Sequence, residues 1–108
     1  MQVLRAAGHF AVREGEPNQY REHFRVADLS VGTYCIPVGG KDGQDPHSED
    51  EIYVVVRGRG RLISETGESD VGPGTVIYVK AHEHHQFTEV TEDLSIVVVF
   101  APAERSRE

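Results

Sequence analysis

Two short runs that are apolar on both faces most constrain the fold of this chain of 108 residues. They are IYVVV at residues 52–56 and LSIVVVF at residues 94–100. In a sheet with one face in water, apolar and polar residues alternate, so strands without this alternation must be covered on both sides. The two runs therefore predict strands at the centre of a closed or two-layered β structure.

The rest of the sequence has the pattern of short antiparallel strands. Runs rich in Val, Ile, Tyr, Phe and Thr are separated by turn residues, and no window of ten or more residues outside 8–20 has a helical stripe. We expect strands at 24–27, 30–36, 52–57, 61–65, 76–79, 84–90 and 94–100, with hairpin turns at 57–61 and 65–70. The pattern predicts an all-β fold, either a small barrel or a two-sheet jelly roll.

Length and charge limit the domain count and the partners. We expect one domain over residues 1–108, with its core at about 20–102 and with the ends, including the last six residues, weakly tied to it. The chain carries 18 acidic and 11 basic residues, and the net charge of −7 argues against a nucleic acid partner. No apolar run approaches the roughly 18 residues of a membrane span. The single cysteine, Cys35, and the missing signal-peptide pattern favour a cytoplasmic setting.

Imidazole and carboxylate side chains form two clusters beside the expected strands. Asp45, His47, Glu49 and Glu51 are spaced by two and share one side if the segment is extended. The second cluster, AHEHHQF at 81–87, follows the strand TVIYV. Imidazoles and carboxylates that reach one pocket from two strands are an ordinary way to bind a divalent metal.

The first cluster resembles the first motif of the cupin superfamily, which has the form G-x5-H-x-H-x3-E-x6-G. In this chain Gly39, His47, Glu51 and Gly58 stand at the matching intervals, and Asp45 replaces the first histidine. The resemblance continues over about residues 30–102 and implies a small single-domain cupin of the conserved-barrel type. Such a barrel is also described as a double-stranded β-helix or jelly roll.

The second cluster resembles the second cupin motif, G-x5-P-x-G-x2-H-x3-N, less closely. Gly74 and His85 match, whereas Lys80, His82 and Glu89 stand in place of the proline, the second glycine and the asparagine. His84 and His85 cannot both point inward from a regular strand, and the motif spacing favours His85.

By position, the resemblance implies a metal bound by His47, Glu51 and His85, with Asp45 in the place of the missing ligand. Two imidazoles and a carboxylate suit Fe, Mn, Ni, Co or Zn as divalent ions and leave positions open for substrate or water. Two alternatives stay open: a hydrogen-bonded pair of His47 and Glu51 in a metal-free barrel, and a plain turn residue at Asp45 before Pro46.

Other side chains near the motifs have less specific signals. Tyr53 and Phe87 have the parity to line the pocket, where Tyr53 would be a hydrogen-bond donor or general acid, or both would simply fill the barrel. The remaining loop carboxylates, Asp42, Glu49 and Asp50, are expected to be solvated.

The resemblance implies a metal-dependent enzyme that acts on a small organic substrate, of the dioxygenase, isomerase or lyase type. The alternatives are a module that binds or senses a metal or small ligand without turnover, and a metal-free structural barrel, because the fold does not choose between them. The resemblance to small cupins also implies a homodimer. The apolar character of residues 52–56 and 94–100 is an independent reason to expect one.

Overall fold

The computed structural model describes residues 1–43 and 45–106, and it consists of strands joined by turns and irregular segments. The strands are β1 (Gln19–Val26), β2 (Leu29–Ile36), β3 (Asp50–Ser64), β4 (Gly67–Val71), β5 (Val76–Val79) and β6 (His85–Ala101). The predicted all-β class is confirmed. Among the described residues, the structure contains no helix with the length and hydropathy to cross a membrane.

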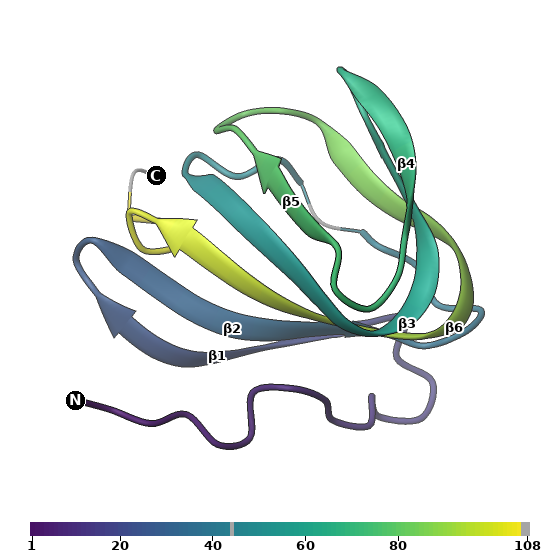
Figure 1. Ribbon diagram of the computed structural model, residues 1–108, viewed down its shortest axis with the longest axis horizontal. Coiled ribbons are helices and arrows are strands. Elements are labelled where there is room, and N and C mark those ends of the chain that lie inside the picture. Colours follow the sequence, from purple (N-terminus) through teal and green to yellow (C-terminus); the bar gives the residue numbers. More distant parts are fainter. Residues whose placement is uncertain (44, 107–108) are drawn as a thin grey trace.

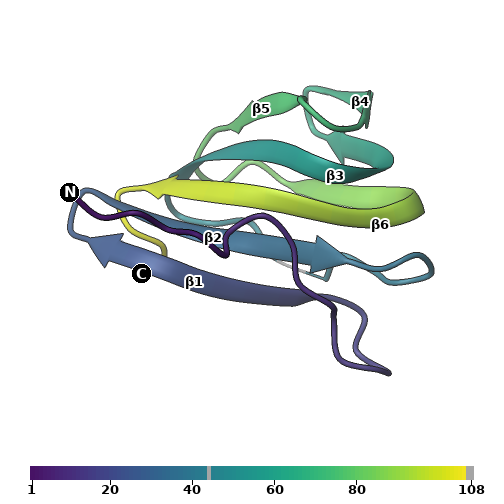
Figure 2. The ribbon, with the colours of Figure 1, turned by 60° about the horizontal axis from the view of Figure 1, so that its bottom comes forward.

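The six strands form one antiparallel sheet that rolls around its core (Figures 1 and 2). The order is β1-β2-β6-β3-β4, and β5 pairs with the first half of β3. β6 is therefore a central strand, with β2 on one side and β3 on the other. The apolar run of β6 lies in the middle of the sheet because only a central strand has neighbours along both of its edges.

The long pair of β3 and β6 is sharply bent. A straight strand rises about 3.3 Å per residue, so the 15 residues of β3 would span roughly 50 Å. The longest dimension of the molecule is only 35 Å. The register shifts three times between Val55 and Arg61, and Gly58 has a φ of 89°. Such bulges bend a strand while it stays paired, and the ends of β3 and β6 turn back toward the core in Figure 1.

The hairpin predicted at 57–61 is wrong. These residues lie inside β3, so the strands expected at 52–57 and 61–65 form one continuous strand. In the same way, the strands expected at 84–90 and 94–100 join in β6. Glycines that favour a turn also permit a bulge, and the composition of RGRGR does not distinguish the two.

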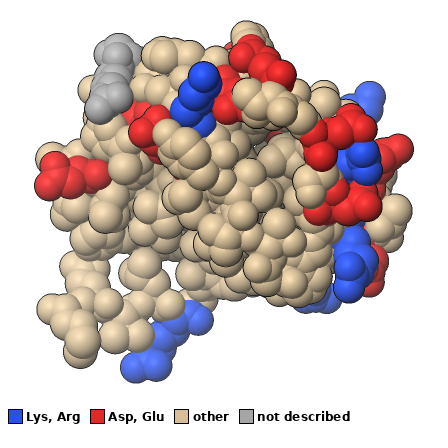
Figure 3. Space-filling model, turned by 45° about the horizontal axis from the view of Figure 1, so that its top comes forward, with Lys and Arg blue, Asp and Glu red and all other residues tan. Residues whose placement is uncertain are grey.

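The polar strand β4 was not expected, because its sequence GESDV has a single apolar residue. It pairs with the end of β3 after a tight turn. Arg61 forms ion pairs there with Glu68 at 2.6 Å and Asp70 at 2.7 Å. Charged side chains of both signs gather on the right of the face shown in Figure 3.

The two faces of the rolled sheet differ in burial. The inner face holds the core, which includes Tyr34, Ile36, Tyr53, Val55, Phe87, Leu94, Ile96, Val98 and Phe100. The outer face of the paired strands β3 and β6 carries Ile52 opposite Val99 and Val54 opposite Val97, all only half-buried. The outer face of these two strands is thus less covered than the two apolar runs predicted.

The N-terminal segment covers part of the outer face beside β2 (Figure 2). The hydroxyl of Thr33 donates a hydrogen bond to the carbonyl of Ala7, and His9 hydrogen bonds to Ser95. Residues ahead of β1 are therefore packed against the sheet and are not the loose end that the sequence indicated.

We expect the bend at Gly58 to be sensitive to any side chain. A Cβ at Gly58 would lie 2.1 Å from the carbonyl oxygen of Asp93, whereas one at Gly74, with nearly the same φ, would meet nothing within 4 Å. Gly74→Ala should lower the free energy of unfolding by about 1–2 kcal/mol, the cost of a positive φ. Gly58→Ala should lower it by roughly 2–5 kcal/mol, because the clash adds to that cost. Urea unfolding measures both, and equal losses would contradict the bend as described.

Candidate metal centre

Three side chains, two from around the start of β3 and one from the start of β6, lie close together at one end of the bent sheet. The atoms of His47, Glu51 and His85 that can bind a metal all lie within 4.8 Å of one another. Glu51 is the second residue of β3, and His85 is the first residue of β6. His47 lies in the loop before β3, where its carbonyl accepts a 2.7 Å hydrogen bond from the amide of His82.

The ring of His85 is oriented so that one nitrogen faces Glu51. Nδ1 lies 2.8 Å from the carbonyl oxygen of Glu83, to which it can only donate. In the neutral ring this leaves Nε2 as an acceptor, 2.8 Å from Oε1 of Glu51. Two acceptors at this distance need a proton or a metal ion between or beside them.

The ring of His47 is also held at one nitrogen and leaves the other directed at Glu51. Its Nε2 lies 3.0 Å from Oε2 of Glu104, and its Nδ1 lies 3.9 Å from Oε2 of Glu51. Within the described residues, His47 Nδ1 and Glu51 Oε2 are buried and have no hydrogen-bond partner. Buried polar atoms nearly always have a partner, so these two need an explanation.

A divalent metal fits these atoms. Bonds of roughly 2.0–2.2 Å to nitrogen and oxygen place two ligand atoms on one ion about 3–4 Å apart. The 3.9 Å between His47 Nδ1 and Glu51 Oε2 agrees with this span and is too long for a hydrogen bond. Two imidazoles and one carboxylate are a ligand set of the kind found around zinc and first-row transition metals.

The surroundings favour positive charge on both histidines. Burial lowers the pKa of His47, but its hydrogen bond to Glu104 and the charges of Glu51 and Glu104 outweigh burial, so the pKa is raised. For His85, burial is again outweighed, here mainly by the hydrogen bond to Glu51, and the pKa is also raised. A site that attracts protons in this way attracts a metal cation for the same electrostatic reason.

Tyr53 lies directly against the site. Its hydroxyl is 3.1 Å from Oε1 of Glu51 and 2.8 Å from Nε2 of His85, and its ring packs edge-on against Phe87. Burial, together with the charge of Glu51, raises the pKa of Tyr53 well above its usual value, so the hydroxyl stays protonated and donates. Phe87 belongs to the core. A catalytic role for Tyr53 stays a prediction.

Asp45 is not in the group that the structure brings together. It is exposed and lines a pocket of about 540 Å³, together with His84 and His85. His84 and His85 point in different directions, since the side chain of His84 is 75% exposed and that of His85 only 3%. Metal binding by Asp45 stays a prediction without a contact to support it.

Two loop carboxylates expected in solvent are buried, so that expectation is wrong for Asp42 and Glu49. Asp42 accepts hydrogen bonds from the hydroxyl of Tyr34 at 2.8 Å and from the amide of Phe87 at 2.9 Å. Their polar sequence gave no sign of burial, because Asp42 bonds to Phe87 and Glu49 to Arg105, both far along the chain.

The C-terminal segment reaches the site, although the sequence indicated a loose end. Ala103 is buried, and Glu104 contacts His47 through its carboxylate. Glu104 lies outside both motifs and in a polar segment, so neither spacing nor hydropathy singled it out.

Comparison with known sequences identifies the family. Residues 32–100 match the family model described as Cupin domain. The uncharacterized protein SCO3923 of Streptomyces coelicolor is similar, with 38% identity over 94 residues, which cover 87% of this chain and 90% of that protein.

Solved structures share the fold at low sequence identity. An RmlC-like cupin protein of Desulfovibrio desulfuricans has a TM-score of 0.77 at 14% identity, with 95% of this chain and 98% of that chain covered. KdgF from Halomonas sp. has a TM-score of 0.75 at 20% identity, with 89% of each chain covered. The DMSP lyase DddQ of Ruegeria pomeroyi has a TM-score of 0.73 at 14% identity, with 93% of this chain and 54% of that chain covered.

The rolled sheet, the match to the family model and the two sequence motifs all point to the same family. The chain belongs to the cupin family, as the spacing of its motifs predicted.

Proposed function

We propose that this cupin binds one divalent metal through His47, Glu51 and His85 and acts on a small organic molecule. The observation that carries the proposal is the pair of buried atoms His47 Nδ1 and Glu51 Oε2, which face each other without a hydrogen-bond partner among the described residues. A cation between them would satisfy both atoms.

The chemistry follows from the ligand set. A bound metal of this class supplies Lewis acidity and a template for the substrate's oxygen atoms. Tyr53 holds its proton and donates to Glu51 or His85, which fixes the direction of both side chains. The ligand set is compatible with oxygenase, isomerase and lyase reactions, and the DMSP lyase of Ruegeria pomeroyi shares this fold.

The substrate would enter through the 540 Å³ pocket beside His85. Its lining includes three carboxylates, those of Asp42, Asp45 and Glu65, and no Lys or Arg among the residues described there. This charge favours a neutral or cationic substrate over an anionic one.

A metal-binding or sensing module without turnover is the second candidate. The pocket is lined by His85 but not by His47 or Glu51, and these two residues are only 7% and 2% exposed. Such shielding favours a metal that is held without access to substrate.

We also propose a homodimer in a cytoplasmic setting, with the outer face of β5, β3 and β6 as the contact. The cross-strand neighbours there are apolar: Tyr78 lies beside Ile52 and Val76 beside Val54. Tyr78 and Val76 are 60% and 63% exposed. Exposed apolar surface of this kind on a sheet is typical of an interface.

The metal proposal is tested with a pair of neighbouring histidines. Protein purified without chelator and reconstituted should hold about one equivalent of metal by elemental analysis. His85→Ala should weaken zinc binding by more than about 100-fold, since even the partners of ligands contribute 10–100-fold. His84→Ala is the matched control and should bind as the wild type does, because its side chain is exposed.

The opposite result, lost metal in His84→Ala and retained metal in His85→Ala, would mean that the ligand is assigned one residue off. Less than about a tenth of an equivalent in the wild type would instead favour the metal-free barrel.

The pH dependence of stability should differ with and without metal. The pKa values of His47 and His85 are raised in the folded state, so their protonation stabilises the metal-free protein below the unfolded value of about 6.5. This stability is lost as the pH rises through the folded pKa. Metal binding requires unprotonated rings, so stabilisation by zinc should grow over the same range. Urea unfolding at several pH values, with zinc or with chelator, measures both trends, and parallel curves would refute this.

Light scattering tests the dimer. The wild type should have twice the 12.0 kDa mass of the chain. Tyr78→Glu should shift the protein toward the monomer because it places a charge in the contact, whereas Val26→Glu, at an exposed apolar residue of the edge strand β1, should leave the mass unchanged. A wild-type mass of one chain would disprove the dimer.

A further inference from the structure

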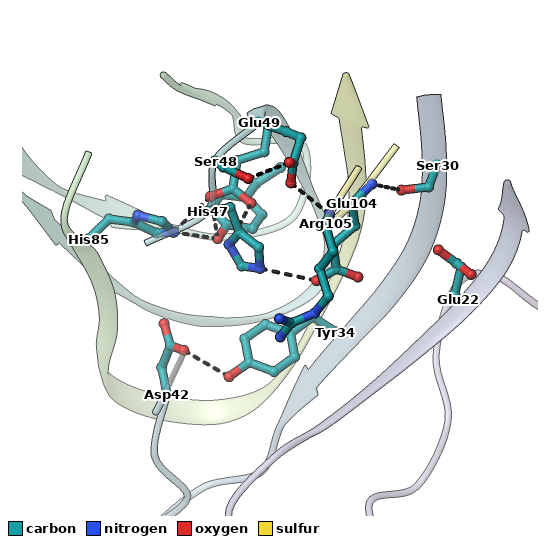
Figure 4. A network of polar contacts seen from close by, with 12 residues as sticks. Glu22, Ser30, Tyr34, Asp42, His47, Ser48, Glu49, His85, Glu104 and Arg105 are labelled. Carbon is teal, nitrogen blue, oxygen red and sulfur yellow. Dashed lines mark hydrogen bonds and ion pairs between the residues drawn. The ribbon is translucent and has the colours of Figure 1, made fainter. Parts of the chain in front are cut away.

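We propose that Glu104 is a positioning residue of the metal centre: its carboxylate orients His47 so that Nδ1 faces Glu51 and His85. This inference rests on the proposed function, because it assigns a partner to one of the proposed ligands. Figure 4 shows Glu104 on the opposite side of the His47 ring from His85.

The contact itself defines the orientation of the ring. Nε2 of His47 is 3.0 Å from Oε2 of Glu104, and both side chains are largely buried, at 7% and 13% exposed. An ionised carboxylate only accepts, so Nε2 carries the hydrogen and Nδ1 of the neutral ring carries the lone pair. A ring turned by 180° would place carbon atoms against both carboxylates and lose this hydrogen bond.

The segment that carries Glu104 is held in place by contacts that do not involve His47. The amide of Glu104 donates to the hydroxyl of Ser30 at 2.9 Å, and the amide of Arg105 donates to Glu49 at 2.8 Å. The carbonyl of Glu104 accepts a 2.5 Å hydrogen bond from Arg25. The segment is thus attached to β1, to β2 and to the loop before β3, and Figure 4 shows the contacts with Ser30 and Glu49.

Such a carboxylate has two effects on a histidine ligand. It fixes the tautomer and the direction of the ring, and it raises the basicity of the nitrogen that binds the metal. Glu104 and Glu51 also carry two negative charges next to the site, which equal the charge of a divalent ion. Because Asp45 does not join the group, three ligating side chains remain, and the orientation of each one matters more.

The test compares Glu104→Met, which has no acceptor, with Glu104→Gln, which keeps one but has no charge. Zinc affinity is measured by competition with a chelating dye, and ¹⁵N NMR shows which nitrogen of His47 carries hydrogen. We expect Glu104→Met to bind zinc roughly 10–100-fold more weakly and to lose the single Nε2–H form. Glu104→Gln should recover part of the affinity.

Ser30→Ala is the control for tail attachment. It removes one anchor of the segment and leaves the partner of His47 in place, so zinc affinity should stay within about 3-fold of the wild type and the Nε2–H form should persist. A loss equal to that of Glu104→Met would show that attachment of the segment matters and not its carboxylate. Thermal unfolding of each variant checks that it is folded.

Two results would overturn the inference directly: an Nδ1–H form of His47 in the wild type, or unchanged zinc affinity and tautomer in Glu104→Met. Failure of the proposed function looks different. If the wild type takes up no zinc, the metal site is wrong, and the tautomer in metal-free protein at alkaline pH still decides whether Glu104 orients His47.

Discussion

The bend in the β3–β6 pair is the constraint on which the site depends. Ser64 pairs with His85, and Glu51 lies 13 residues earlier in β3, yet Glu51 and His85 are 2.8 Å apart. Only a pair that turns back on itself brings these two ends together. The register shifts around Gly58 provide that turn, and they keep β3 and β6 paired on both sides of it. The candidate metal centre therefore depends on strand curvature as much as on the side chains that form it.

The charges around the site favour the binding of a cation. The carboxylate of Glu51 lies between two imidazoles whose outer nitrogens are engaged by Glu83 and Glu104. Each ring is thereby held with a nitrogen toward the same carboxylate. In a buried setting such an arrangement is stable only with added positive charge, either as protons or as a metal. The raised pKa values of both histidines and the unpartnered atoms of His47 and Glu51 are two consequences of this one arrangement.

The fold class and the three residues of the candidate site could be predicted from the sequence. The fixed intervals of the motifs pointed to His47, Glu51 and His85, and the apolar runs pointed to an all-β fold. The bulges could not be predicted, because RGRGR suits a hairpin turn as well as a bent strand. The burial of Asp42 and Glu49 depends on hydrogen bonds from Tyr34 and Arg105, which are distant in the sequence or outside any motif. Glu104 was missed for the same reason, since only the folded chain places it beside His47.

The position of β6 has a consequence for biogenesis. It is the last strand in the sequence and also the shared neighbour of β2 and β3. During synthesis, β2 and β3 leave the ribosome before the strand that joins them exists, so the nascent chain carries unpaired apolar edges until β6 has been translated. Long-range pairing of this kind closes slowly and leaves such edges open to aggregation. Chaperones that cover these edges during translation would thus protect the domain until β6 is available.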